Sequence, residues 1–431
     1  MREHGPNARF GAAWTALALA AWLSGCGAGG GGSQPAAATP AQPTPAPSMA
    51  TAVAQALAAG TAVDPQIVSI DNGFGLSLFN TLNQGYAGNL AISPTSVALA
   101  LQIVYNGAAG TTQQGMAQAL RVQGLSTLQL DSDNAALQAS LSNPDPAVQL
   151  TLANSLWMHL SDNPVLASFI QANQTYYAAQ IGDLAGAPAD VNTWVASQTS
   201  GLITQILPAD FNPATADAVI VNAIYFKAPW SSPFDSSQTA AQPFTLADGS
   251  QVSCQMMHQS GIFGYLQGAN FQMVRLPYGQ DNHLSMIIAL PAQGVSLASF
   301  VAALTNDELN TWIAGLQAVA GAIALPRFTS NYAGSLVSAL TTLGMGVAFN
   351  PQLADFSGIA PLTYLSDVEH ATLVQVDEAG TVAAGATSVS IGIEAVPANT
   401  FSMTMDHPFF YVIRDDLSGA LLFIGTMVNP G

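Results

Sequence analysis

The sequence has very few charged residues, and basic residues are the scarcest. Among 431 residues, charged side chains make up 7%, whereas an ordinary soluble domain has roughly 25%. Lys227 is the only lysine, and together with six arginines it leaves a formal net charge of -18. Proteins bind nucleic acids, heparin-like polyanions and anionic lipid headgroups through clusters of Lys and Arg. The composition therefore excludes all three as expected partners.

Long apolar runs are also missing, because no run that is both uncharged and apolar reaches the roughly 18 residues of a membrane-spanning helix. A shorter apolar run, 11–23, follows Arg2 and Arg9 and precedes Ser24, Gly25 and Cys26. This arrangement predicts a secretory signal peptide over residues 1–25. Its end resembles a bacterial lipoprotein signal, so we expect lipidation of Cys26 after export. The expected location is a bacterial membrane, at the cell surface or periplasmic face, held only by the lipid anchor. A plain secretory signal with an incidental cysteine is the alternative.

Motifs of catalytic and metal sites are absent too. The chain has no His-Glu-x-x-His, Gly-x-Ser-x-Gly, Gly-x-x-x-x-Gly-Lys or Cys-x-x-Cys motif. With Cys26 lipidated, Cys254 is the only thiol left, so no intrachain disulfide is expected, and we interpret it as a small core residue. Residues 131–134 (Asp-Ser-Asp-Asn) hint at a calcium loop but lack its glycine and distal glutamate, which favours a solvated helix cap. We therefore expect no enzyme, no metal and no cofactor.

What is present suggests a tether followed by one domain. Residues 26–63 are rich in Gly, Pro, Ala and Thr, and such segments cannot bury enough apolar surface to fold. From residue 64 to residue 431 the composition is that of a globular protein, without a second linker or an internal repeat. We therefore predict a single domain over 64–431.

Helical and strand patterns occupy different parts of this domain. Apolar periodicity and end signals predict helices over residues 71–82, 93–105, 111–120, 164–177 and 189–207. Runs of β-branched, aromatic or alternating residues predict strands over residues 219–226, 271–277, 283–290, 322–328, 371–376, 409–414 and 421–428. A helix-rich N-terminal half followed by a strand-rich remainder indicates an α+β fold with large, mostly antiparallel sheets.

Residues 376–400 combine features of a strand and of an exposed loop. Alternate residues share one strand face, namely Thr381, Ala383, Gly385, Thr387, Val389, Ile391 and Ile393. This face begins with small side chains, which a strand entering a packed sheet needs because each misfit costs about 1 to 3 kcal/mol. The Gly, Ala, Ser and Thr content and Pro397 suit an exposed loop. The local pattern leaves two interpretations, a segment with two conformations or an ordinary surface loop.

Four separated segments resemble the serpin family, the serine protease inhibitors that act by loop insertion. They are NLAISPTSVALALQIVYNGAAGTTQQGMAQAL (89–120), VNAIYFKAPWSSPFDSSQT (221–239) followed by FTLADGSQVSCQMM (244–257), VDEAGTVAAGATS (376–388) and DHPFFYVIRDDLSGALLFIGTMVNP (406–430). They occur in the family's order, and the resemblance covers residues 64–431. It implies the serpin fold with an exposed reactive loop.

The resemblance also implies a mechanism. In inhibitory serpins a target serine protease attacks the loop, and the cleaved loop inserts into the main sheet before the acyl-enzyme is hydrolysed. The inhibitor is thus a suicide substrate. The implied hinge of the loop consists of Gly380, Thr381, Val382, Ala383, Ala384, Gly385 and Ala386. Val382 departs from the family's frequent Glu but lies on the opposite face from Thr381, so nothing in the hinge obstructs insertion.

The family's usual offset of sixteen residues from Glu378 places the reactive bond between Glu394 and Ala395. The expected target is then a glutamate-preferring serine protease. A slip of one or two residues would instead place Ile393, Ala395 or Val396 before the cut, and would favour elastase-like or subtilisin-like proteases.

The resemblance also implies two clusters of interacting residues around the point where the sheet opens. The family's shutter, a buried polar network, corresponds to Ser93, Ser96, Asn222 and His370. The breach at the top of the sheet corresponds to Trp230, Arg327 and Glu378, with an ion pair expected between the last two. Taken alone, His370 would be an ordinary core histidine.

Two functions remain open. The first is inhibition of a serine protease by a monomeric, exported chain. The second is a non-inhibitory surface protein with the serpin fold, which binds partners and is only cleaved by proteases. The small residues of the hinge favour inhibition.

Overall fold

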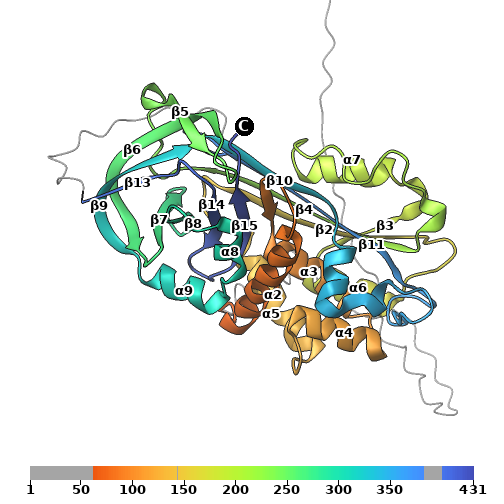
Figure 1. Cartoon of the computed structure of the whole chain (residues 1–431). Coiled ribbons are helices and arrows are strands. Elements are labelled where there is room, and N and C mark those ends of the chain that lie inside the picture. Colours follow the sequence, from red (N-terminus) through yellow and green to blue (C-terminus); the bar gives the residue numbers. More distant parts are fainter. Residues whose placement is uncertain (1–61, 143, 383–399) are drawn as a thin grey trace, which may run out of the picture. The chain divides into compact units, whose positions relative to one another are not determined.

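The computed structural model describes residues 62–142, 144–382 and 400–431 (Figure 1). The helices in these ranges are α2 (Pro65–Asn83), α3 (Pro94–Tyr105), α4 (Gly110–Leu120), α5 (Thr127–Leu141), α6 (Ala167–Tyr176), α7 (Ala189–Gln198), α8 (Leu297–Ala302), α9 (Asn306–Ala314) and α10 (Val337–Leu340). None of the described helices combines the length and the apolar character that crossing a membrane requires.

The strands form two sheets. The strands are β1 (Leu90–Ile92), β2 (Gln149–Met158), β3 (Gln180–Asp183), β4 (Ala218–Pro229), β5 (Ala240–Thr245), β6 (Gln251–Gln267), β7 (Phe271–Tyr278), β8 (Leu284–Pro291), β9 (Gln317–Pro326), β10 (Phe328–Ser335), β11 (Leu365–Val376), β12 (Gly380–Thr381), β13 (Phe401–Thr404), β14 (Phe409–Asp415) and β15 (Leu421–Met427).

The nine-stranded sheet has the order β1-β15-β14-β8-β7-β6-β9-β13, with β5 paired to β6. The six-stranded sheet has the order β10-β11-β12-β4-β2-β3, and β11 also pairs directly with β4. Most neighbours run antiparallel, while β2 with β3, β4 with β11 and β9 with β13 run parallel. The expected α+β architecture with large, mostly antiparallel sheets is therefore confirmed.

The six-stranded sheet is covered on both faces. On one face α7 lies over β2 and β4, and its Val191 and Val195 are buried in a cluster with Val221 and Ala371 (Figure 1). On the other face α3 packs against the same two strands, and all of its residues are buried. The start of α3 follows from local chemistry, because the Ser93 hydroxyl accepts the Ser96 N–H and Pro94 occupies the first turn. Side chains of β4 and β11 thus alternate between an α7 face and an α3 face.

Several predicted elements differ in extent from the observed ones, and in two of them the structure shows the physical reason. The predicted helix 189–207 ends at Gln198, because Ser200 and Gly201 adopt positive φ angles of 53° and 78°. The side chain of Asn192 then accepts the N–H groups of Ile206 and Leu207. The predicted strand 322–328 is divided between β9 and β10 at Arg327, because the chain passes there from pairing with β6 in one sheet to pairing with β11 in the other. The Arg327 N–H donates to the Gln255 carbonyl at 2.8 Å, in register with the β6–β9 pairing.

The polar motif at residues 131–134 lies inside α5, so it is neither a calcium loop nor the solvated helix cap that we favoured. Asp131 and Asn134 are buried there and share the hydroxyl of Tyr177 as a hydrogen-bond partner. Among the described residues, no three His, Cys, Asp or Glu side chains are grouped so that they could hold a metal ion.

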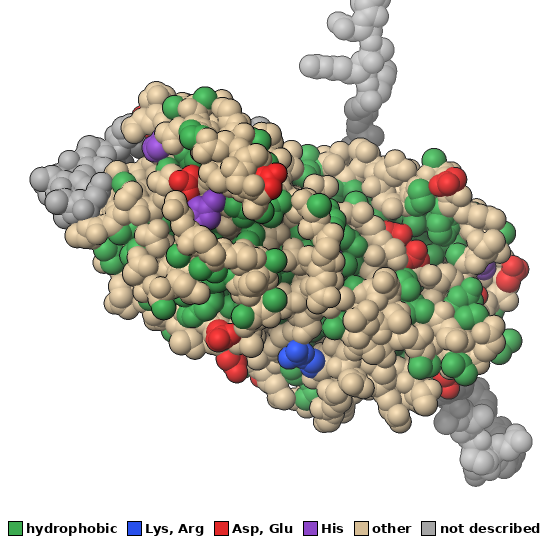
Figure 2. Space-filling model, viewed as in Figure 1, with side chains coloured by type: hydrophobic (Ala, Val, Ile, Leu, Met, Phe, Trp, Pro, Cys, Tyr) green, Lys and Arg blue, Asp and Glu red, His purple; other side chains and the backbone are tan. Residues whose placement is uncertain are grey.

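The surface reflects the unusual composition. In Figure 2, uncharged polar groups, backbone and hydrophobic side chains cover most of the visible face, and the few charged groups are scattered. No basic cluster is visible on that face.

Candidate functional site

The candidate site is the line along which β4 and β11 lie side by side, which we call the seam. Its lower end is the row of Leu365 and Ala218, and direct parallel pairing continues up to the row of Ala371 and Ala223. Above that row the direct pairing of the two strands stops. The seam therefore has a closed lower part and an upper part in which β4 and β11 are not paired with each other.

The upper end of the seam is occupied by β12. Thr381 pairs antiparallel with Val376 of β11 and with Ala228 of β4. Both partners lie five residues beyond the last directly paired row, Ala371 and Ala223, so the register is the same above and below. Four rows therefore separate β12 from the closed part of the seam, 372–375 on β11 and 224–227 on β4. An antiparallel strand continuing from β12 would fit these rows without any shift of register.

The first hinge residue of β12 is a glycine for a steric reason. Gly380 has a φ of 154°, and a Cβ there would lie 2.1 Å from the carbonyl oxygen of Ala228. A larger residue would push β12 away from β4, because real Cβ atoms do not approach so closely. Gly380 thus allows the chain to enter between the two strands.

Thr381 is held in the sheet by buried contacts that the sequence did not reveal. Its side chain is fully buried, and its Oγ1 lies 2.6 Å from the hydroxyl of Tyr278. The Tyr278 ring stacks on Trp230 with 4.3 Å between ring centroids. Val382, the next hinge residue, has a φ of 50° and donates its N–H to the Gln375 carbonyl at 2.8 Å. The chain therefore enters the sheet at Gly380 and Thr381, and its backbone turns left-handed at Val382.

The predicted breach residues meet just above β12. Arg327 Nε lies 2.9 Å from each Glu378 carboxylate oxygen, and Nη2 lies 2.7 Å from Oε1. Burial acts to raise the pKa of Glu378, but the hydrogen bonds from Arg327 and Thr239 outweigh it and hold that pKa below its usual value. Trp230 donates from its indole to the Asp377 carbonyl and from its backbone to the Ala379 carbonyl, both at 2.9 Å. These contacts fix the chain just before the hinge.

The predicted shutter residues meet in the closed part of the seam, on the α3 face. Ser93 N–H donates to His370 Nε2 at 3.1 Å, so the ring proton sits on Nδ1 and is donated to Asn222 Oδ1 at 2.5 Å. Burial lowers the pKa of His370 to about 3, which keeps the ring neutral. Asn222 Nδ2 also contacts Ser96 Oγ and Asn154 Oδ1. Because Asn222 and His370 are row partners on β4 and β11, their hydrogen bond crosses the seam.

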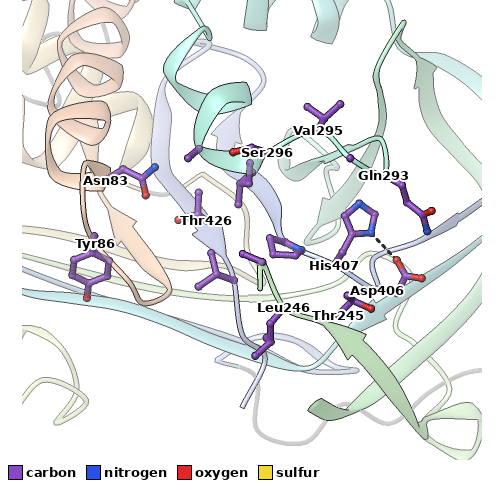
Figure 3. Close-up of a pocket in the computed structure, with 16 residues that line it drawn as sticks. Asn83, Tyr86, Thr245, Leu246, Gln293, Val295, Ser296, Asp406, His407 and Thr426 are labelled. Carbon is purple, nitrogen blue, oxygen red and sulfur yellow. Dashed lines mark hydrogen bonds and ion pairs between the residues drawn. The ribbon is translucent and has the colours of Figure 1, made fainter. Parts of the chain in front are cut away.

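A separate cavity of about 650 Å³ lies between the end of α2, the β5–β6 turn, the start of α8 and residues 406–408 (Figure 3). His407 points towards Asp406 there, with Nδ1 2.7 Å from the carboxylate and Nε2 2.8 Å from the Pro291 carbonyl. Both ring nitrogens are thus engaged, and neither is free to activate a nucleophile. The pair fits a structural role in the hairpin segment.

Sequence reasoning missed three members of the seam environment: Asn154, Tyr278 and Thr239. They come from β2, β7 and the segment before β5, far from the hinge in the chain, and no local motif marks them. Some predicted residues lie outside the described ranges, namely Cys26, Ala383, Ala384, Gly385, Ala386, Glu394 and Ala395.

Comparisons with known proteins bear on this arrangement. The family model "Serpin (serine protease inhibitor)" matches residues 69–430. The leukocyte elastase inhibitor of Homo sapiens is 32% identical over 383 residues, which cover 85% of this chain and all of that protein. The corresponding protein of Bos taurus is 33% identical over 384 residues, with the same coverage.

Solved structures agree with the sequence relatives. Native tengpin, a thermophilic serpin, superposes with a TM-score of 0.79 at 29% identity, covering 86% of this chain and 95% of that one. Human thyroxine-binding globulin complexed with thyroxine superposes with a TM-score of 0.75 at 26% identity, covering 85% of this chain and 98% of that one. The predicted serpin fold is thereby confirmed. With its hinge between two strands of the six-stranded sheet and a family match over nearly the whole described domain, this chain belongs to the serpin family.

Proposed function

We propose that this chain inhibits a serine protease as a suicide substrate, by cleavage of its reactive loop and insertion of the loop into the seam. The observation that carries the proposal is the position of β12, which already lies between β4 and β11 in the register that a longer inserted strand would need. The names of the relatives, leukocyte elastase inhibitors, support the same activity.

The chemical steps follow from acyl transfer. The protease serine attacks the Glu394 carbonyl, the bond to Ala395 breaks, and Ala395 leaves as a new amino terminus while Glu394 is held as an ester. Insertion before hydrolysis traps this ester. About a dozen new backbone hydrogen bonds, each worth about 0.5 to 1.5 kcal/mol net, would supply on the order of 10 kcal/mol. This equals the stability of a whole domain, so the uncleaved form is kinetically trapped.

The loop composition restricts the target. Residues 383–399 contain neither Lys nor Arg, so a protease that requires a basic residue before the cut finds no site there. Cleavage after Glu394 fits a glutamate-preferring enzyme. Cleavage after Ile393, Ala395 or Val396 fits an elastase-like or subtilisin-like enzyme, and the elastase inhibitors among the relatives favour the elastase-like class.

The rival function is a non-inhibitory serpin that is merely cleaved. Against it stands the hinge, since Gly380 and Thr381 are accommodated between the strands without a clash. We also propose that the chain is a monomer and that it is not an enzyme. The hydrogen bonds that occupy both ring nitrogens of His407 support the second of these proposals.

Export and lipid anchoring through Cys26 form a separate part of the proposal. It rests on the basic start, the short apolar run and the small residues before Cys26. Labelled palmitate should enter the wild-type chain expressed in a bacterium, and Cys26→Ser should abolish labelling. Equal labelling of both would contradict the anchor.

A gel tests inhibition directly. The mature domain is mixed with pancreatic elastase, subtilisin and a glutamate-specific protease, and a complex that survives heat and SDS is expected with at least one. Mass spectrometry of the released C-terminal fragment then locates the cut, expected after one of residues 393–396. Cleavage without any complex, and without a rise in the unfolding temperature of the cleaved chain, would favour the rival function.

A further inference from the structure

The closed part of the seam contains a buried carboxyl group, one oxygen of which has no hydrogen-bond partner among the described residues. Glu369 of β11 is only 7% exposed, and its Oε2 is buried without a hydrogen-bond partner. Burial, and after it the neighbouring Asp367 carboxylate, raises the pKa of Glu369 to about 8. A buried acceptor without a donor destabilises the form that contains it. Among the described residues, the carboxyl group of Asp367 interacts with Glu369 and raises its pKa further, while Oε2 remains without a partner.

The surroundings of Glu369 explain why no donor is available. Its row partner across the seam is Val221, and the row partner of Asp367 is Val219, so two carboxyl groups face two valines on the α7 face. On its other side, β11 pairs with β10, where the hydroxyl of Ser335 donates to Asp367.

The other titratable groups around Glu369 do not supply a donor either. His370 points to the opposite face and is committed to Ser93 and Asn222. The Tyr332 hydroxyl of β10 donates to the Ser335 carbonyl, and its pKa is raised to about 12 by burial and by the negative charges of Glu369, Tyr86 and Asp367.

The register of β12 predicts what would lie beside Glu369 in an inserted form. Thr381 lies between Val376 and Ala228, and each further residue along the loop descends by one row. Residue 388 then falls between Glu369 and Val221, and residue 390 between Asp367 and Val219. The chain has serine at both positions. Residue 387, which faces the other way, falls between His370 and Asn222.

We infer that Glu369 and Asp367 form an acceptor site for the chain's own reactive loop, occupied in the inserted form by the hydroxyls of Ser388 and Ser390. This inference rests on the proposed function and deepens it, because it fixes the row that each loop residue occupies. Partners in adjacent antiparallel strands project to the same face at about 4.5 to 5.5 Å between Cα atoms, which is within reach of a hydroxyl and a carboxyl group. In the closed seam, Glu369 Oε2 has no partner among the described residues, and insertion would supply a hydroxyl donor.

A double-mutant cycle on the cleaved chain tests the pairing. Ser388→Ala and Glu369→Val are made singly and together, the loop is cut with the protease that the gel assay identifies, and the guanidinium midpoint of unfolding is measured. Ser388→Ala should lower the midpoint of the cleaved form in the wild-type background, and have no effect in the Glu369→Val background. It should leave the midpoint of the uncut form unchanged. Thr387→Ala, on the opposite face, should act equally in both backgrounds.

A disulfide test keeps the register falsifiable if Glu369→Val does not fold. Val221→Cys combined with Ser388→Cys should cross-link under oxidation in the cleaved form and not in the uncut form, because row partners meet the Cα spacing of a disulfide. Val221→Cys with Val389→Cys is one row away and faces the other side, so it should not cross-link.

The failures of the two proposals are distinguishable. If cleavage raises the midpoint of every variant but Ser388→Ala acts equally in both backgrounds, the acceptor site is wrong and insertion stands. Cross-linking of the mismatched pair would overturn the register. If cleavage raises the midpoint of no variant, the proposed function itself is wrong.

Discussion

The two parts of the seam are held by different interactions. The lower part has direct backbone pairing from Leu365 to Ala371, and the His370–Asn222 hydrogen bond crosses it. The upper part has no direct pairing of β4 with β11, and among the described residues Gly380 and Thr381 pair at its top. One half of the seam thus resists a new strand, whereas the other already admits the first two residues of one.

This difference suggests a division of labour. In the proposed mechanism, the upper part would let insertion begin at low cost, because the register needs no change. The lower part would set the barrier, because each further row requires that β4 and β11 separate and that the polar contacts of Asn222 break. The following predictions test whether the two parts are independent in this way, and they are given from the largest expected effect to the smallest.

The largest effect is expected from Thr381→Arg. The side chain of Thr381 is fully buried beside Tyr278, and an unpaired arginine there would cost several kcal/mol. Insertion should stop at its first step, and the SDS-stable complex should fall at least 100-fold while cleavage of the loop continues. Thr329→Arg, at an exposed position of β10, serves as the control and should inhibit like wild type. Normal inhibition by Thr381→Arg would show that the upper part is not the entry point.

Glu378→Lys should open the seam prematurely. It replaces the ion pair with Arg327 by two neighbouring cations and also removes the acceptor of Thr239. We expect several-fold faster conversion to polymer or to an inactive monomer during mild heating, measured by native gels. Asp281→Lys changes the net charge by the same amount at an exposed turn and should convert at the wild-type rate. Unchanged monomer and unchanged inhibition in Glu378→Lys would count against the pair.

The lower part should weaken in acid. The pKa of buried His370 is lowered from 6.5 to about 3, so the unfolded chain binds a proton at this residue below about pH 6.5 while the folded chain does not, and stability is lost as the pH falls from 6.5 towards 3. The loss is about 1.4 kcal/mol per pH unit. His370→Gln should be less stable than wild type at pH 7, and the gap should narrow by about 2 to 3 kcal/mol at pH 4.5 in urea unfolding.

The difference in unfolding free energy between wild type and His370→Gln isolates the contribution of the histidine. Asp71 and Glu369 have pKa values raised to about 7 and about 8, so their contributions change in the opposite direction over this range. Both groups are present in wild type and variant, and their effects cancel. A constant gap between pH 7 and pH 4.5 would show that His370 does not lock the seam through its neutral form.

The smallest effect is expected from Thr239→Val. This substitution removes one hydroxyl donor to Glu378 and leaves the contacts of Arg327 in place. The uncut form should lose about 1 kcal/mol of unfolding free energy, measured as a shift of the thermal midpoint. In a Glu378→Gln background the same change should lower the unfolding free energy little further. An equal loss in both backgrounds would show that Thr239 does not act through Glu378.

Much of the fold could be predicted because its signals are local. Ser93 and Pro94 mark the start of α3 correctly, and β-branched runs mark β4, β8 and β15. Strand β2, QLTLANSLWM, was missed because polar residues such as Asn154 interrupt its apolar pattern. The division at Arg327 is not predicted from the sequence, because it marks where the chain leaves its partner β6 in one sheet for β11 in the other, and both partners are distant in the chain.

Only part of the site could be predicted from the sequence. The family's spacing placed Arg327 near Glu378 and His370 near Asn222, and the structure brings both pairs together. Nothing in the spacing indicated that Tyr278 would contact Thr381, or that Glu369 would be buried without a donor. Such contacts depend on which strands become neighbours, and a single sequence does not encode that in any short segment.

Strands β4 and β11 both have 12 residues, so in the proposed insertion they would set how much of the loop the sheet can take up. Counted down from Thr381, the last row of β4, at Ala218, receives residue 391, and the last row of β11, at Leu365, receives residue 392 because of a bulge in their pairing. After a cut behind residue 394, two or three residues would extend beyond the last paired row. A protease attached to residue 394 would then lie outside the sheet. Deleting two residues of the loop would bring that protease against the edge of the sheet. Adding several residues would leave the protease unconstrained, so that it could hydrolyse the ester and be released.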